Sequence, residues 1–448
     1  MDKSAEPFEV PSGRPARGRV AAPPSKSHAI RALVCAALAE GTSTLHGLAR
    51  CDADDVQRTI TALRALGIAI DGERVIGAGG RIPNPNVTLD LGGSGTAFRF
   101  LAAVAALGPG RTTLTGDASL RRRPMRSIVD PLRTLGVHVE CEAGELAPLV
   151  VSGGPPTRDE VSVDASSTSQ ALSALKLIGP ALPRGLRVRT TGGAVSESYV
   201  QVTSETMVQF GAWITSENEL MERAILDAQV LRVTGQEPPK LEVLRERIRR
   251  EQGTYHPANM AIEGDWSGAA FLLAAAAVSL GDVTVGGLRW ESAQADAIVV
   301  GVLSSFGAHV KADDGGARAA GRDRHPLDVD LRDAPDLAPL VGALGCVASG
   351  TTRVRGAAHL RIKESDRIAA VAAAARALGC EAHELPDGFE IDGPAKHGGL
   401  IETRHDHRIA MAFAVAGLAI PGVVIDDPAC VAKSYPGFWE DLARLTAG

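Results

Sequence analysis

Residues 360–367 crowd lysine, arginine and carboxylate side chains into one short stretch, with Lys363, Glu364 and Arg367 among them. A strand-like segment precedes this stretch, and an alanine-rich, helix-prone run at 368–378 follows it. We therefore expect these charges at a turn and a helix N-terminus, where side chains can point into a cleft. The cations there could bind an anionic substrate, and the carboxylate could move a proton. A salt-bridged surface turn would also explain the pattern, because exposed pairs are common and contribute little.

Lys26, Ser27 and Arg31 form a second candidate site, at the predicted start of an apolar helix. The helix dipole disfavours cations at this end, so a purely structural role explains them poorly. Because Lys26 and Arg31 do not share an i,i+3 or i,i+4 spacing, they diverge around the helix axis. They could therefore contact two different anions.

The glycine-rich segment 92–96 precedes another predicted helix, 97–107. Glycines let backbone N–H groups approach a phosphate closely, so the segment predicts an anion-binding nest. We expect Gly93 at positive φ, as part of this backbone arrangement; the alternative is that this glycine only opens space for a ligand. A structural cap is the alternative, and the nearby Arg99 favours a functional role.

Three motifs follow one another along the chain: Pro-Ser-Lys-Ser-His-Ala-Ile-Arg at 24–31, Gly-Gly-Ser-Gly-Thr-Ala-Phe-Arg at 92–99 and Leu-Arg-Ile-Lys-Glu-Ser-Asp-Arg at 360–367. Together they resemble the 5-enolpyruvylshikimate-3-phosphate synthase family, the 3-phosphoshikimate 1-carboxyvinyltransferases. One motif alone would be weak evidence, but their combination along nearly the whole chain makes the resemblance specific. It implies transfer of the enolpyruvyl group from phosphoenolpyruvate to the 5-hydroxyl of 3-phosphoshikimate, with release of phosphate.

The resemblance also implies which residues bind the two substrates. The family's 3-phosphoshikimate contacts match Lys26, Ser27, Arg31, Thr168, Ser169, Gln170, Ser196, Tyr199, Asp336 and Lys363. The family's phosphoenolpyruvate contacts match Lys26, Gly95, Arg123, Gln170, Arg367, Arg408 and Lys433.

Enolpyruvyl transfer requires protonation of the vinyl carbon, attack by a hydroxyl and loss of phosphate from a tetrahedral intermediate. One acid and one base must therefore reach the same carbon. By resemblance, Asp336 and Glu364 are that carboxylate pair, while Lys26 and Lys433 help to protonate or neutralise the departing phosphate.

The sequence departs from the family pattern at three positions. Gly93 stands where Asn is common, Thr168 where Ser is usual and Phe98 where Met is common. None of these changes removes an acid, a base or an arginine, so we expect effects on substrate affinity only.

We expect neither a cofactor nor a metal ion in this protein. His405 and His407 could be metal ligands, but their i,i+2 spacing and the lack of a third candidate nearby argue against a metal site.

A helix that ends in Leu-Gly or Phe-Gly and is followed by a short strand recurs along the chain, at Gly67, Gly136, Gly211, Gly307 and Gly379. Each glycine is predicted to be the left-handed residue that ends its helix. Between these copies lies a second type of helix, apolar nearly all round, with a polar first turn. Strands and helices thus alternate, which predicts an α/β fold of buried helices whose N-termini could bind anions.

The resemblance implies how these elements are arranged: two domains, each of three βαβαββ repeats around buried parallel helices, an inside-out α/β barrel. We expect one domain at 25–262 and a second that combines 1–24 with 263–448, with the active site in the cleft between them. Residues 217–251 exceed the repeat and predict a surface insertion with a solvated helix, the alternative being a partner-binding element.

Composition limits the classes of partner. The 448-residue chain has a net charge of −6 and only 4% aromatic residues, which argues against nucleic-acid binding. The N-terminal residues lack the apolar segment of a signal peptide, and no apolar run is long enough to span a membrane. The six cysteines are scattered, so we expect reduced thiols in a cytoplasmic protein. We expect a monomer whose only partners are its two substrates.

Three other functions remain open at this point. They are the same reaction on a shikimate analogue, a UDP-N-acetylglucosamine enolpyruvyl transferase of the same fold, and a non-catalytic anion-binding paralogue. Lys26, Ser27 and residues 363–367 fit the shikimate pattern better than the second alternative. Asp336 and Glu364 argue against the third, because a binding protein has no use for a carboxylate pair beside anions.

Overall fold

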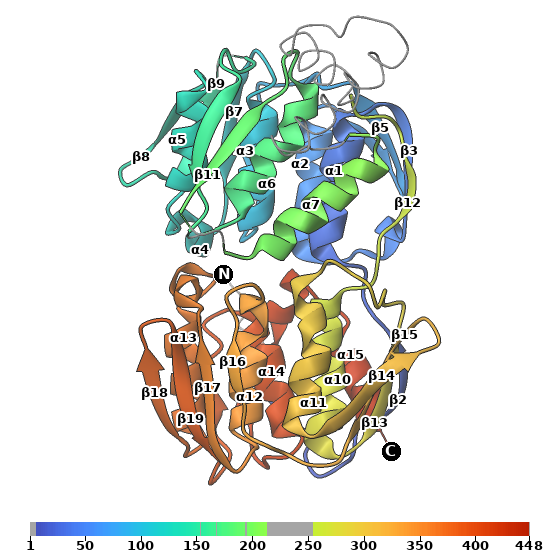
Figure 1. The fold of residues 1–448 in the computed structure, drawn as a ribbon, viewed down its shortest axis with the longest axis vertical. Coiled ribbons are helices and arrows are strands. Elements are labelled where there is room, and N and C mark those ends of the chain that lie inside the picture. Colours follow the sequence, from blue (N-terminus) through green and yellow to red (C-terminus); the bar gives the residue numbers. More distant parts are fainter. Residues whose placement is uncertain (1–5, 153, 167, 193–194, 213–253, 448) are drawn as a thin grey trace, which may run out of the picture.

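The computed structural model describes residues 6–152, 154–166, 168–192, 195–212 and 254–447. The chain forms two lobes, one above the other in Figure 1. Each lobe has its own hydrophobic core. Buried side chains between Ala29 and Ile262 form the core of the first lobe, and those of Val10–Val20 and Trp266–Leu445 form the core of the second.

Four sheets share one strand order, in which a parallel pair is extended by two antiparallel strands. Two belong to the first lobe: β12 (Asn259–Ala261), β3 (Glu40–His46), β5 (Arg74–Ala78), β4 (Ala69–Asp71), and β6 (Thr88–Asp90), β7 (Arg111–Thr115), β9 (Leu146–Ser152), β8 (His138–Glu142). Two belong to the second: β2 (Arg17–Ala21), β13 (Asp282–Gly286), β15 (Gly316–Gly321), β14 (Ala308–Asp313), and β16 (Asp328–Asp330), β17 (Gly350–Arg355), β19 (Gly388–Gly393), β18 (Glu381–Leu385).

Two smaller sheets also contain a parallel pair. In the first lobe, β10 (Glu160–Asp164) pairs with β11 (Arg187–Thr191). In the second, β20 (Leu400–Ile401) pairs with β21 (Val424–Ile425), and β1 (Phe8–Glu9) adds an antiparallel strand. Mixed sheets alternating with helices confirm the predicted α/β class.

The helices with polar first turns are buried along most of their length, as predicted from their apolar sequences. They are α1 (Lys26–Leu38), α3 (Gly95–Ala105), α6 (Gln170–Ile178), α10 (Trp266–Ser279), α12 (Ala338–Gly345) and α14 (His407–Gly417). Short side chains close several of their N-termini. In α10, for example, the Asp265 carboxylate accepts a hydrogen bond of 2.8 Å from the backbone N–H of Gly268.

The helices predicted to end in Leu-Gly or Phe-Gly do end just before those glycines. These helices are α2 (Asp54–Ala65), α5 (Arg126–Thr134), α7 (Glu197–Gln209), α11 (Val299–Phe306) and α13 (Arg367–Ala377). The glycine that follows each of them has positive φ: Gly67 (92°), Gly136 (88°), Gly211 (76°), Gly307 (115°) and Gly379 (80°). The remaining helical segments are α4 (Ala118–Arg121), α15 (Phe438–Thr446), η1 (Leu48–Arg50), η2 (Gly179–Ala181), η3 (Ala295–Ile298), η4 (Pro335–Leu337), η5 (Ala358–Ile362) and η6 (Pro428–Lys433).

The chain passes between the lobes at two adjacent segments. The backbone N–H of Ser25 donates to the Glu263 carbonyl at 2.8 Å, and that of Asp265 donates to the Pro23 carbonyl at 2.8 Å. An isolated bridge joins Pro24 to Gly264 between them. The two crossing segments therefore support each other where the lobes meet.

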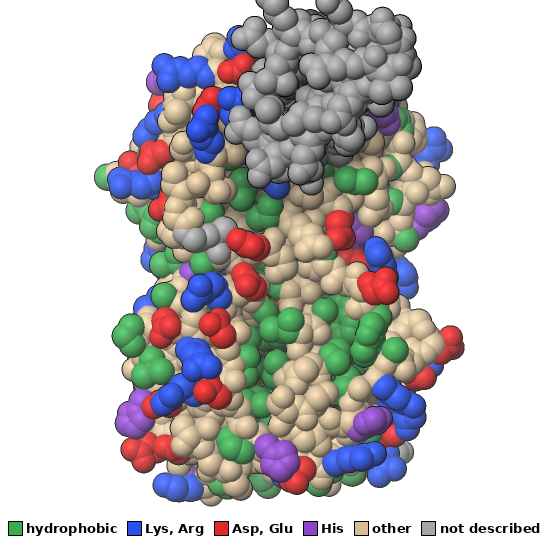
Figure 2. Space-filling view, viewed as in Figure 1, with side chains coloured by type: hydrophobic (Ala, Val, Ile, Leu, Met, Phe, Trp, Pro, Cys, Tyr) green, Lys and Arg blue, Asp and Glu red, His purple; other side chains and the backbone are tan. Residues whose placement is uncertain are grey.

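On the face shown in Figure 2, charged side chains of both signs are scattered over both lobes, with no broad basic surface. No described helix combines the length and the apolar character needed to cross a membrane. The six cysteines are free thiols. The insertion expected at 217–251 lies outside the described residues.

Candidate active site

One cavity of about 670 Å³ brings together nearly all of the residues predicted to bind substrate. Its walls include Lys26, Ser27, Arg31, Gly95, Arg123, Thr168, Ser169, Gln170, Ser196, Tyr199, Asp336, Lys363, Glu364, Arg367 and Arg408. Both lobes contribute, and most of these residues stand at helix N-termini. Lys433 is absent from the walls, but it reaches the site through its ion pair with Glu364, at 3.2 Å.

Asp336, in η4, lies between two arginines of the second lobe. Its Oδ1 is 2.8 Å from Nη1 of Arg367, and its Oδ2 is 2.8 Å from Nη2 of Arg408. The hydroxyl of Tyr199 donates to Oδ2 from the first lobe at 3.0 Å. Burial raises the pKa of Asp336, but Arg408, Lys363 and Arg367 outweigh burial and hold that pKa well below its ordinary value. These cations therefore favour the ionised carboxylate.

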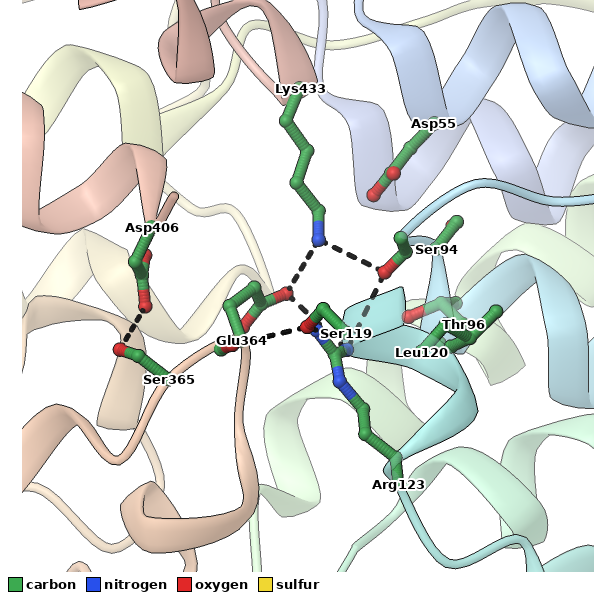
Figure 3. A network of polar contacts seen from close by, with 12 residues as sticks. Asp55, Ser94, Thr96, Ser119, Leu120, Arg123, Glu364, Ser365, Asp406 and Lys433 are labelled. Carbon is green, nitrogen blue, oxygen red and sulfur yellow. Dashed lines mark hydrogen bonds and ion pairs between the residues drawn. The ribbon is translucent and has the colours of Figure 1, made fainter. Parts of the chain in front are cut away.

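Glu364 is surrounded by a different set of cations. Oε1 lies 3.2 Å from Nζ of Lys433 and 3.7 Å from Nη1 of Arg123, and Oε2 lies 3.0 Å from Nη2 of Arg367. Burial raises the pKa of Glu364, yet Lys433, Arg367 and Arg123 outweigh it and keep that pKa well below its ordinary value. Figure 3 shows Lys433, Arg123 and Glu364 converging from separate elements. Among the described residues, Arg367 is thus the one cation that forms an ion pair with both predicted carboxylates.

Three carboxylates outside the predicted set hold the cations of the site. Asp406 binds Arg367, with Oδ2 2.8 Å from Nε. Asp55, in the first turn of α2, binds Lys26 at 2.9 Å. Asp296 lies 3.6 Å from Arg408. These partners could not be predicted from the sequence, because each contact joins elements distant in the chain.

The surroundings of Lys26 and Lys363 shift the pKa values of these two lysines in opposite directions. Burial lowers the pKa of Lys26, but Asp55 outweighs it and the net change is upward. Burial lowers the pKa of Lys363, and Asp336 opposes that shift without reversing it. Of the two lysines, Lys363 therefore gives up its proton more easily.

Arg31 is held rigidly on the first-lobe side of the cavity. Its Nε donates to Oγ1 of Thr203 at 2.7 Å, Nη1 donates to the Ser27 carbonyl at 2.8 Å and Nη2 to the Tyr199 carbonyl at 3.1 Å. Burial lowers the pKa of this guanidinium to about 10. A fixed, buried arginine is suited to capture of a carboxylate or phosphate.

Gln170 links two neighbouring helix starts. Its amide donates to Oγ1 of Thr96 at 3.2 Å, and its oxygen accepts from Nη1 of Arg99 at 2.8 Å. Arg99 also lines the cavity. From the sequence it was expected to be functional, but it was assigned to neither substrate. Ser196, before α7, has a φ of 56°, and such strain in a non-glycine residue is typical of functional sites.

The expectation for Gly93 is wrong. Positive φ occurs at Gly92, with a value of 53°, and not at Gly93. Gly93 instead presents its carbonyl to two cations, Lys433 Nζ at 2.9 Å and Arg123 Nη1 at 3.4 Å. A Cβ at Gly93 would lie 2.8 Å from the Lys433 nitrogen and 2.8 Å from a carboxylate oxygen of Asp117. The glycine is needed for this close approach, not for an unusual φ.

The two histidines considered as metal ligands lie in different environments. His405 is exposed and contacts Asp427 at 2.7 Å. His407 is buried in the cavity wall, and neither of its ring nitrogens has a hydrogen-bond partner. Burial lowers the pKa of His407 well below its ordinary value, and Lys26 adds to this effect. Within the described residues, no group of three or more His, Cys, Asp or Glu side chains is arranged to hold a metal ion.

His359 and Arg123 also line the cavity. His359 lines the cavity with its Nε2 unpartnered, and burial lowers its pKa to about 4. Among the three consecutive arginines at 121–123, Arg121 and Arg122 are exposed, and Arg123 is the one that lines the cavity.

A family model matches most of the chain. The model of the EPSP synthase (3-phosphoshikimate 1-carboxyvinyltransferase) family matches residues 10–235 and 243–442. The match leaves out residues 236–242, which lie within the segment 217–251 where we expected an insertion.

Similar proteins span nearly the whole chain. A 3-phosphoshikimate 1-carboxyvinyltransferase from Methanopyrus kandleri is 38% identical over 96% of both chains. One from Methanospirillum hungatei is 36% identical over 95% of both. The solved structure of an EPSP synthase from Acinetobacter baumannii superposes with a TM-score of 0.72 at 25% identity, covering 98% of this chain and 97% of that one.

Proposed function

The chain belongs to the EPSP synthase (3-phosphoshikimate 1-carboxyvinyltransferase) family, and from this premise we propose how its side chains transfer an enolpyruvyl group from phosphoenolpyruvate to the 5-hydroxyl of 3-phosphoshikimate. The observation that carries the proposal is the pair of ionised carboxylates, Asp336 and Glu364, on either side of Arg367 in a cavity lined with cations. This pair supplies proton-transfer groups beside anion-binding groups.

The acceptor substrate occupies the side of the cavity that the first lobe builds. Arg31 and Lys26 bind the carboxylate of 3-phosphoshikimate, while Thr168, Ser169, Gln170, Ser196 and Tyr199 bind its phosphate and ring. Support comes from the presence of all seven in one cavity wall. Asp336 and Lys363 face them from the second lobe and reach the hydroxyl that reacts.

Phosphoenolpyruvate lies among the remaining cations, Arg123, Arg367, Arg408, Lys433 and Lys26, beside Gly95 and Gln170. Glu364 and Asp336 form ion pairs with Arg123, Arg367, Arg408 and Lys433. An anionic substrate competes for the same cations, which weakens their hold on the carboxylates and raises the carboxylate pKa values. The carboxylates can then take up and return protons.

The reaction has two steps. A proton is added to the methylene carbon of phosphoenolpyruvate, and the acceptor hydroxyl, losing its proton to a carboxylate, forms the new C–O bond to the adjacent carbon. In the second step the C–O bond to phosphate breaks, a proton leaves the methyl group and the enol ether forms. Glu364 and Asp336 exchange these protons, while Lys26 and Lys433 neutralise or protonate the departing phosphate.

We also propose the finer architecture. In the described part of the chain, two hydrophobic cores and six sheets that each contain a parallel pair support domains at 25–262 and at 1–24 with 263–448. Each would consist of three βαβαββ repeats around buried helices, an inside-out α/β barrel. The protein would act as a cytoplasmic monomer, and light scattering during gel filtration tests the monomer directly.

Release of phosphate, measured with purified protein, tests the proposed reaction. With phosphoenolpyruvate, we expect turnover with 3-phosphoshikimate, slower turnover with a shikimate analogue that lacks the phosphate, and none with UDP-N-acetylglucosamine. Preference for either of the other acceptors would reject the proposed substrate. Binding of 3-phosphoshikimate without any turnover would indicate the non-catalytic alternative.

A further inference from the structure

A closed ring of polar contacts joins the two lobes beside the cavity. Its members are Gly93, Arg123 and Ser119 of the first lobe and Glu364 and Lys433 of the second. Lys433 Nζ and Arg123 Nη1 both donate to the Gly93 carbonyl, and Lys433 Nζ pairs with Glu364 Oε1. Ser119 closes the ring (Figure 3).

Ser119 is the neutral side chain in this ring, and it serves both lobes at once. Its hydroxyl accepts from Nη2 of Arg123 at 3.1 Å and donates to the backbone carbonyl of Glu364 at 3.1 Å. A hydroxyl has one proton to donate and lone pairs to accept with, so one side chain can make both bonds together. Ser119 does not line the cavity itself.

Arg123 depends on Ser119 more than on its other partners. The Arg123 contacts with Gly93 and Glu364 are longer, at 3.4 and 3.7 Å, and its Nε is buried without a partner. The bond to Ser119 is therefore the shortest contact that fixes the plane of this guanidinium. The orientation of that plane decides whether an arginine can bind a carboxylate or phosphate through two bonds.

Glu364 is held by Ser119 through its main chain, not through its carboxylate. The residue lies between η5 and α13, in a turn where regular helix bonding is interrupted. A bond to its carbonyl fixes the backbone from which the carboxylate extends, and small displacements of such groups are costly in catalysis.

We propose that Ser119 is a positioning residue that couples the orientation of Arg123 to the placement of Glu364 across the two lobes. This inference rests on the proposed role of Arg123 in binding phosphoenolpyruvate. Loss of the hydroxyl releases Arg123 and Glu364 together, so binding of phosphoenolpyruvate and turnover suffer while binding of 3-phosphoshikimate does not.

Steady-state phosphate release by Ser119→Ala tests this coupling. We expect KM for phosphoenolpyruvate to rise and kcat to fall, each by about tenfold, as for loss of a hydrogen bond to a charged group. KM for 3-phosphoshikimate should stay within about twofold of the wild-type value, and Ser119→Thr, which retains the hydroxyl, should restore most of the loss. Ser304→Ala is the control, because the exposed Ser304 hydroxyl only donates to Val300 of its own helix.

A double-mutant cycle with Arg123→Lys separates positioning from general destabilisation. If Ser119 acts through Arg123, the two changes are not additive in kcat/KM for phosphoenolpyruvate. Additive effects, equal changes in both KM values or an unchanged Ser119→Ala enzyme would overturn the proposal. If Ser119→Ala fails to fold, Ser119→Cys takes its place in the same cycle. Absence of turnover in the wild-type protein would instead reject the proposed function, so the two failures are distinguishable.

Discussion

The guanidinium of Arg367 and the carboxylate of Asp406 form an ion pair with almost no exposure to solvent. Nε of Arg367 lies 2.8 Å from Oδ2 of Asp406, and the two side chains are 1% and 0% exposed. The same carboxylate caps α14 by accepting from the backbone N–H of Arg408 at 3.0 Å. Asp406 thus positions both of the arginines that contact Asp336.

Removal of this buried carboxylate should destabilise the protein strongly. We expect Asp406→Asn to lower the free energy of unfolding by about 3–5 kcal/mol, because it breaks the fully buried ion pair at Nε of Arg367 and removes the charged cap of α14. Asp427→Asn removes the carboxylate from the exposed contact with His405 and should cost at most about 1 kcal/mol. Urea unfolding measures both, and equal small losses would contradict the structural role of Asp406.

The sequence predicted the helices and their ends because these depend on local patterns, whereas most of the expected substrate contacts were implied by the family resemblance. Residues near one another in the chain determine two of these patterns. One is the Leu-Gly or Phe-Gly pair at a helix end, and the other is the polar first turn of an apolar helix. The partners Asp55, Asp296 and Asp406 could not be predicted in the same way, because each meets its cation only after packing. A weak signal existed for Asp406, which immediately precedes a predicted site helix.

Gly93 shows a second limit of the sequence. The pattern of four small residues at 92–95 predicted an unusual backbone conformation, and the structure places it one residue earlier, at Gly92. What constrains Gly93 is a lysine from the other lobe, far away in the chain. Local sequence contains no information about that approach.

Substitution by alanine should therefore affect different properties at the two positions: stability at Gly92 and turnover at Gly93. Gly92→Ala should cost about 1 kcal/mol or more of stability, because an L-residue is strained at positive φ. Gly93→Ala should leave stability nearly unchanged but displace Lys433, lowering kcat by up to about tenfold. Thermal unfolding and phosphate release measure the pair, and Gly93→Ala with wild-type kcat would contradict the role given to this close approach.

Asp296 should make stability fall as pH rises in the acid range. Burial raises the pKa of Asp296 from 3.8 to about 6, despite Arg408. The folded protein thus holds this proton more tightly than the unfolded chain, and the stabilisation is lost as pH rises from 3.8 to about 6. Relative to Asp296→Asn, wild-type stability should decline over that window by up to about 3 kcal/mol.

Urea unfolding at several pH values checks this slope. Asp314→Asn is the control, because the Asp314 side chain is 94% exposed. Parallel pH profiles for the wild-type protein and Asp296→Asn would show that Asp296 does not retain its proton.

The central claim is that Asp336 and Glu364 carry protons during enolpyruvyl transfer. The most direct test is kcat for phosphate release by Glu364→Gln and Asp336→Asn, with phosphoenolpyruvate and 3-phosphoshikimate both saturating. We predict that each substitution lowers kcat by about 10²–10⁴ with only modest changes in KM, because the lost groups act in the transition state. Wild-type turnover in both variants would contradict the account.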